Sequence, residues 1–123
     1  MSDNHTTIHD RLEDILESID LIQEWSKGRT KVDDFVMSSM GVMAFNACVM
    51  RFQVIGEQVG KLLDNSEHPL DGYEHIPWHA IYGLRNIISH EYANIDEEII
   101  VSTINNDIQP LKEAVEDMLK KVI

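Results

Sequence analysis

Apolar residues recur at steps of three and four along the first quarter of the chain, the spacing of one face of an α-helix. This stripe contains Ile8, Leu12, Ile15, Leu16, Ile19 and Ile22. Acidic residues take the other side, most simply as a solvated face. The pattern predicts a helix from about Thr7 to Lys27. Thr6 or Thr7 can serve as its N-cap. Gly28 follows the last turn, where a left-handed backbone conformation commonly ends a helix.

A second, longer apolar pattern predicts a helix over roughly Ser39 to Leu63, after a short turn through residues 35–37. Its apolar residues occur nearly all round the helix, which indicates burial on more than one side and allows for a dimer contact. Gly56 and Gly60 each cost this helix about 1 kcal/mol relative to alanine. We interpret both glycines as sites of close helix approach rather than of phosphate binding.

The remainder of the chain predicts three more helices after a loop over residues 64–76, which is rich in Asn, Ser, Pro, Gly and His. Pro77 is placed at the first turn of one helix, and Asp96 is placed to cap the next. Asp107, with Pro110 in the first turn, starts the last. No strand-type alternation stands out, so we expect an all-α bundle of four or five helices forming a single domain over residues 1–123.

The composition of the chain indicates where in the cell the protein works. The opening residues are polar and lack the layout of a signal peptide, and no apolar run approaches the roughly 20 residues that cross a bilayer. Cys48 is the only cysteine and sits among apolar neighbours, so we interpret it as a buried thiol. These features predict a cytoplasmic protein without a membrane segment. The net charge of −12 repels nucleic acid at long range and favours a basic protein partner.

The stretch from Arg85 to Tyr92 carries the chemistry, in the pattern R-x4-H-x-Y. Arginine can hold a phosphate by two hydrogen bonds, and the imidazole of His90 can move protons near neutral pH. On an ideal helix Arg85 and Tyr92 lie within about 20° of each other, whereas Arg85 and His90 lie about 140° apart. The side chains of Arg85 and His90 can reach one ligand only if the helix unwinds around His90, or if two copies of the chain, related by a two-fold axis, both contribute residues to one cleft.

In such a shared cleft, one His90 would take the proton of a ribose 2′-hydroxyl and the second copy's His90 would protonate the leaving oxygen. Arg85 would hold the phosphate, with Asn86 helping to fix the imidazole or the phosphate. The structural alternative is that these side chains only cap carbonyls or pair with acids such as Glu91. No histidine pair has a ligand set at zinc-site spacing, so we expect neither a metal nor a cofactor.

Several motifs in order resemble the HepT-like group of HEPN-domain proteins. They are Arg51-Phe52-Gln53-Val54-Ile55-Gly56-Glu57, Ile76-Pro77-Trp78, Gly83-Leu84-Arg85-Asn86, His90-Glu91-Tyr92, Ile95-Asp96, Asp107-Ile108 and Leu111. The resemblance covers roughly residues 45–115. It implies a homodimeric HEPN-type bundle, a ribonuclease toxin acting on RNA, and Arg85 and His90 as its catalytic residues.

The resemblance also implies a partner: a minimal nucleotidyltransferase antitoxin (MntA-like) that transfers AMP to the motif tyrosine, here Tyr92. Arg51 and Glu57 either support the site or hold two helices together. Two other interpretations stay open. The chain could be a non-catalytic binding partner and modification substrate of the nucleotidyltransferase, which the acidic charge favours, or a helical scaffold without a site.

Overall fold

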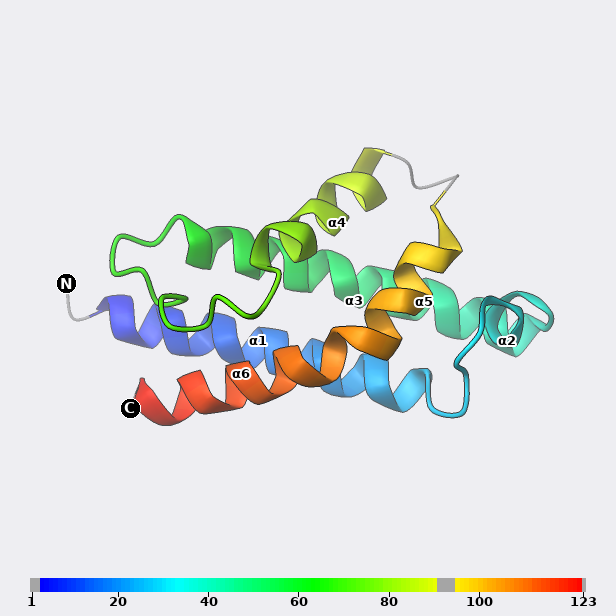
Figure 1. Cartoon of the computed structure of the whole chain (residues 1–123), viewed down its shortest axis with the longest axis horizontal. Helices are drawn as coiled ribbons and strands as arrows, with labels where there is room; N and C mark the ends of the chain where they lie inside the picture. The colour runs from blue at the N-terminus through cyan, green and yellow to red at the C-terminus, as the bar shows by residue number, and fades with distance from the viewer. Residues whose placement is uncertain (1–2, 91–94, 123) are drawn as a thin grey trace.

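The fold is a bundle of helices, seen in a computed structural model that describes residues 3–90 and 95–122, with the backbone alone at residues 3–6, 87, 89 and 90 (Figure 1). The helices in these ranges are α1 (Asp3–Trp25), α2 (Val32–Val36), α3 (Ser39–Leu63), α4 (Trp78–His90), α5 (Glu97–Asn106) and α6 (Ile108–Lys121). The described residues include no strand. The all-α prediction is therefore confirmed, with one short helix more than expected.

The helices stack across the bundle in the order α4, α3, α1, α6 (Figure 1). The long helix α3 contacts α1 on one side and α4 on the other, which explains why its apolar residues extend round most of its circumference. The shorter helix α5 links the α2 end of the molecule to α6. Within the described ranges, no helix combines the length and apolar character needed to cross a membrane.

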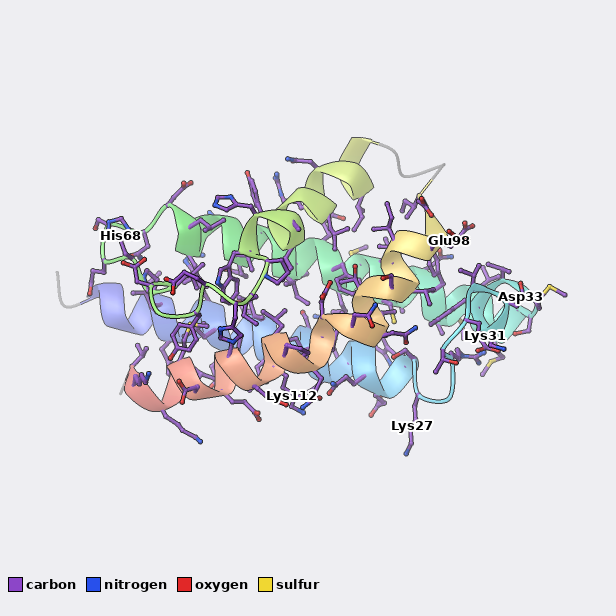
Figure 2. The ribbon with its side chains drawn as sticks, in the orientation of Figure 1. Lys27, Lys31, Asp33, His68, Glu98 and Lys112 are labelled. Atoms are coloured by element: carbon purple, nitrogen blue, oxygen red, sulfur yellow. The ribbon has the colours of Figure 1, made fainter. Side chains whose placement is uncertain are left out.

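The core is built on the stripe predicted for the first helix. Ile8, Leu12, Ile15, Ile19 and Ile22 are each at most 3% exposed and belong to one cluster with the buried face of α3. Burying each such side chain contributes about 1.5–3 kcal/mol relative to leaving it in water. A salt bridge of 3.0 Å between Lys112 of α6 and Asp20 adds to the α1–α6 contact; Lys112 is labelled in Figure 2.

The predicted start of the first helix was wrong. The helix begins at Asp3 rather than Thr7, so neither Thr6 nor Thr7 is its cap. The other predicted boundaries are close: α3 has the expected bounds, and Gly28 adopts a φ of 78° after α1. The Asp96 carboxylate accepts a hydrogen bond of 2.9 Å from the backbone N–H of Glu98, as an N-cap should.

The short turn predicted through residues 35–37 was also wrong, because Val32–Val36 forms the helix α2. The Asp34 carboxylate accepts hydrogen bonds from the backbone N–H groups of Thr30 and Lys31, at 2.9 and 3.0 Å. These bonds lower the pKa of Asp34 below its ordinary value. Phe35 is fully buried and anchors the helix to the core. Local hydrogen bonds and one apolar anchor thus stabilise a helix too short to show a periodic pattern.

Candidate functional site between α3 and α4

Two glycines of α3 bring α4 unusually close. A Cβ placed on Gly56 would lie 2.6 Å from the Cβ of Arg85, and one placed on Gly60 would lie 2.5 Å from the ring of Tyr82. The glycines are four residues apart, and Tyr82 and Arg85 are three apart, so the two pairs match across the helix contact. This confirms that Gly56 and Gly60 serve close helix packing. The contact seats the first turn of the R-x4-H-x-Y stretch against α3.

The guanidinium of Arg85 is held loosely. Its Nε lies 3.9 Å from Oε1 of Glu57, and its Nη1 donates a long hydrogen bond of 3.4 Å to the amide oxygen of the exposed Asn86. The Arg85 side chain is 36% exposed and that of Glu57 49% exposed. An ion pair this open is worth at most about 1 kcal/mol. A phosphate approaching from solvent can therefore replace the carboxylate at low cost.

An open hollow of about 350 Å³ lies beside Arg85, between the last turns of α3 and the middle of α4. It is lined by Glu57, Gly60, Lys61, Asp64, Tyr82 and Arg85. Four of these residues were not among the predicted site residues: Gly60, which was interpreted as a packing position only, and Lys61, Asp64 and Tyr82. Helical spacing in the sequence could have indicated the last three. Lys61 and Asp64 follow Glu57 by four and seven residues, and Tyr82 precedes Arg85 by three, so each shares a helix face with a predicted site residue.

The backbone of α4 is helical from Trp78 through His90, so the helix does not unwind between Arg85 and His90. The two residues therefore remain about 140° apart around the helix axis. The side chain of His90 and the whole of Tyr92 lie outside the described residues. Their meeting with Arg85 in one cleft, and the role of Tyr92, stay predictions.

Arg51 faces a different neighbour from the one that Glu57 faces. Its Nη1 lies 3.9 Å from Oε1 of Glu17 on α1, whereas Glu57 pairs with Arg85 on α4. Six residues along a helix turn the side chain by about 120°, which explains the divergence. Of the two predicted supporting residues, the structure places Glu57 beside Arg85 and places Arg51 at the contact between α1 and α3.

Large apolar side chains remain exposed on the outer side of α3 and just before it. Met37, Met40, Met43 and Met50, which we call the methionine surface, are between 56% and 77% exposed. Met43, Met50 and Glu57 follow one another at seven-residue steps, so they share one face of α3 within about 40°. The methionine surface therefore leads along α3 to the Glu57–Arg85 pair. Exposed apolar patches of this kind mark interaction sites.

Cys48 has no place in this chemistry. Its thiol is fully buried, as predicted, and burial raises the pKa of Cys48 to about 12. In the part of the chain that the structure describes, no three His, Cys, Asp or Glu side chains are grouped to hold a metal ion. The described residues at the hollow offer the cation of Arg85 and its polar neighbours.

The chain matches the family described as "Ribonuclease HepT-like" over residues 15–118. It is 32% identical over 110 residues to a protein of Caldanaerobacter subterraneus subsp. tengcongensis provisionally named as an RNase, covering 89% of this chain and 92% of the relative. It is 30% identical over 111 residues to a protein of Thermococcus cleftensis provisionally named ribonuclease HepT, covering 90% and 94%.

A longer relative comes from Methanocaldococcus jannaschii and is named as a gamma-glutamylcyclotransferase and, provisionally, an RNase. The identity is 32% over 114 residues, and the match spans 90% of this chain but only 47% of that protein. No solved structure matches the chain significantly. The family match over most of the chain, with relatives of similar length at 30% identity or more, shows that this chain belongs to the HepT-like ribonuclease family.

Proposed function

We propose that the chain is a cytoplasmic, metal-independent endoribonuclease and the toxin of a toxin–antitoxin module. Membership of the HepT-like ribonuclease family supports the activity. The observation that carries the proposal is the loosely held, part-exposed guanidinium of Arg85, fixed at its base by the Gly56 contact and open at its tip to a polar hollow. A planar cation in that position suits binding of a phosphodiester.

The working unit in this proposal is a homodimer. Because α4 is continuous through His90, one helix cannot turn both Arg85 and His90 toward one small ligand. A second copy related by a dyad would supply the missing groups. The methionine surface supports this arrangement, since it is apolar and exposed, and its residues Met43 and Met50 share a face of α3 with Glu57. Covering it with a second copy would bury apolar area next to both Arg85 side chains.

The reaction needs only side chains of the two copies. One His90 accepts the proton of a ribose 2′-hydroxyl as that oxygen attacks the adjacent phosphorus. The bond from phosphorus to the 5′-oxygen breaks, and the second copy's His90 donates a proton to that oxygen. Arg85 stabilises the charge that develops on the phosphoryl oxygens. The products are a 2′,3′-cyclic phosphate and a 5′-hydroxyl end.

A nucleotidyltransferase antitoxin would silence this site at Tyr92. The phenol oxygen of Tyr92 attacks the α-phosphorus of ATP, pyrophosphate leaves, and AMP stays on the tyrosine. On an ideal helix Tyr92 and Arg85 share a face, so the added phosphate would occupy the arginine and block the substrate. The net charge of −12 also fits a basic protein partner.

Three substitutions test the proposal: Arg85→Ala, His90→Ala and Arg51→Ala. Arg51 is the matched control, because it is also an arginine of the core helices and also lies 3.9 Å from a glutamate, but it faces α1. We expect RNA cleavage to fall at least 100-fold in the first two variants, and to persist in Arg51→Ala. Equal cleavage in all four proteins would overturn the proposed site.

The second candidate function is a non-catalytic binding partner and modification substrate of the nucleotidyltransferase. The acidic balance of 22 acidic against 10 basic residues favours it, because RNA must reach the cleft against repulsion. This candidate predicts no cleavage by the wild type but intact AMP transfer to Tyr92. Transfer is measured with labelled ATP and the purified partner, with Tyr92→Phe as the control.

A further inference from the structure

The wall of the hollow beside Arg85 includes an aromatic side chain, that of Tyr82. The ring of Tyr82 rests on the backbone of α3 at Gly60, so close that a Cβ there would lie 2.5 Å from its Cε1. Tyr82 is only partly buried, and it lines the hollow together with Arg85. Tyr82 and Arg85 are three positions apart in the helix, so their side chains are neighbours on one face of α4. An aromatic ring held in place next to a phosphate-binding cation is the arrangement that a nucleotide requires.

The hollow also holds a second cation. Lys61 lies in the last turn of α3 and lines the hollow, and it has no ion pair with any described residue. In contrast, Arg51, Arg85, Lys112 and Lys121 each pair with an acid. Of the other lysines without a described ion pair, Lys27 and Lys31 lie at the α2 end of the molecule (Figure 2), and Lys120 lies in the last turn of α6. Lys61 is thus positioned to meet a phosphate next to the one on Arg85.

Asp64 completes the lining with a hydrogen-bond acceptor. A carboxylate accepts hydrogen bonds from the exocyclic amino groups of cytosine, adenine or guanine, and it repels the two carbonyl oxygens of uracil. The volume of about 350 Å³ is ample for one base. Ring, cation and acceptor therefore match the face of the base, a phosphate and the amino group of the base in one nucleotide of single-stranded RNA.

We propose that the hollow formed by Gly60, Lys61, Asp64 and Tyr82 binds the nucleotide that flanks the scissile phosphate. The base of this nucleotide stacks on Tyr82, and Asp64 accepts a hydrogen bond from the amino group of the base. The phosphate on the side of the nucleotide away from the scissile bond contacts Lys61. The inference rests on the proposed ribonuclease function and adds to it a substrate-binding subsite with a preference against uridine. None of these residues touches the reacting atoms, so they set affinity and sequence preference rather than the chemical step.

The test compares Tyr82→Leu, Tyr82→Phe, Lys61→Gln and Lys27→Gln with the wild type. Leucine keeps the apolar packing of Tyr82 but removes the stacking face, whereas phenylalanine keeps both. Lys27→Gln removes the same charge from an exposed lysine remote from the hollow. Binding of a short single-stranded RNA with a 2′-O-methyl group at each ribose, which prevents cleavage, is measured by fluorescence anisotropy. Cleavage of the unmodified RNA gives KM and kcat.

We expect Tyr82→Leu to weaken binding and raise KM about tenfold, with kcat within about twofold, and Tyr82→Phe to match the wild type. Lys61→Gln should reduce the slope of log Kd against log salt by about 0.7, the value for one phosphate contact on a single strand. Lys27→Gln should leave it unchanged. Placing uridine at the flanking position should weaken binding to the wild type but not to Asp64→Asn.

The outcomes separate this inference from the function on which it rests. If the wild type cleaves RNA and Arg85→Ala does not, while Tyr82→Leu and Lys61→Gln bind and cleave as the wild type does, the subsite is wrong and the ribonuclease stands. If the wild type does not cleave, the binding measurements still decide the subsite. Equal affinities of the wild type, Tyr82→Leu and Lys61→Gln for the modified RNA would overturn it. Circular dichroism confirms that each variant is folded.

Discussion

The Cβ of Arg85 lies directly against the backbone of Gly56, and a methyl group on Gly56 would come within 2.6 Å of it. This contact joins the chemistry of α4 to the core of the molecule, because α3 is packed on α1 along its opposite side. The arginine is therefore fixed at its root while its guanidinium stays open to solvent. A binding group held in this way loses little conformational freedom when a phosphate arrives.

Replacing Gly56 should disturb this contact. We expect Gly56→Ala to push α4 away from α3, lowering the free energy of unfolding by about 1–3 kcal/mol and reducing RNA cleavage. Gly83→Ala is the matched control on α4, since a Cβ there meets nothing within 4 Å. It should leave cleavage unchanged and stabilise the helix by up to about 1 kcal/mol. Urea unfolding and cleavage rates measure both; equal stability of the two variants would contradict the close contact.

Removing the carboxylate that competes for Arg85 should improve RNA binding. Glu57→Gln abolishes the 3.9 Å ion pair, so we expect KM to fall about two- to fivefold, with a change in stability of at most about 1 kcal/mol. Glu17→Gln removes the same charge from the equivalent pair with Arg51. It should change KM much less. A rise in KM on Glu57→Gln would instead assign Glu57 to positioning Arg85.

The methionine surface should control assembly. Lysine at both Met43 and Met50 places two charges on an exposed apolar face, so the proposed dimer should dissociate and cleavage should fall with it. Because these side chains are 62% and 56% exposed, the fold itself should change by less than about 0.5 kcal/mol per site. The control adds two lysines at the exposed Ser102 and Asn106 of α5. Light scattering reports the mass; a monomeric wild type would refute the dimer.

Acid should weaken the α2 segment through Asp34. Backbone N–H groups of Thr30 and Lys31 lower the pKa of Asp34 below its ordinary value of 3.8. The charged carboxylate therefore contributes stability above that value, and the contribution is lost as the pH falls through the lowered pKa. Asp34→Ala should melt at a lower temperature than the wild type at pH 7, and the gap should close at low pH. Asp33→Ala, the control, should show a smaller gap at pH 7.

Much of this architecture follows from the sequence pattern. The stripe from Ile8 to Ile22 identified the buried face of α1, and the glycine pair of α3 indicated the close approach of another helix. The pattern failed at α2, because five residues are too few for a periodic signal and the Asp34 hydrogen bonds decide the conformation there. It also failed at the start of α1, because residues 3–6 are helical although they precede the apolar stripe.

The candidate site was only partly predictable for a related reason. Arg85 could be identified by its motif, but its neighbours depend on how two helices are rotated against each other. Arg51 and Glu57 are only six residues apart, yet one pairs with α1 and the other with α4. Likewise, Tyr82 and Lys61 become neighbours of one hollow only because Gly60 lets the helices approach.

The central claim is a metal-free cleavage that uses the 2′-hydroxyl, and the ends of the RNA product test it most directly. Wild-type protein should cleave single-stranded RNA in the presence of EDTA and leave 2′,3′-cyclic phosphate and 5′-hydroxyl ends, detected by mass spectrometry. Added Mg²⁺ or Ca²⁺ should each lower KM to a similar extent, by screening the acidic surface. Loss of cleavage in EDTA at moderate monovalent salt, or 5′-phosphate ends on the products, would contradict the proposed mechanism.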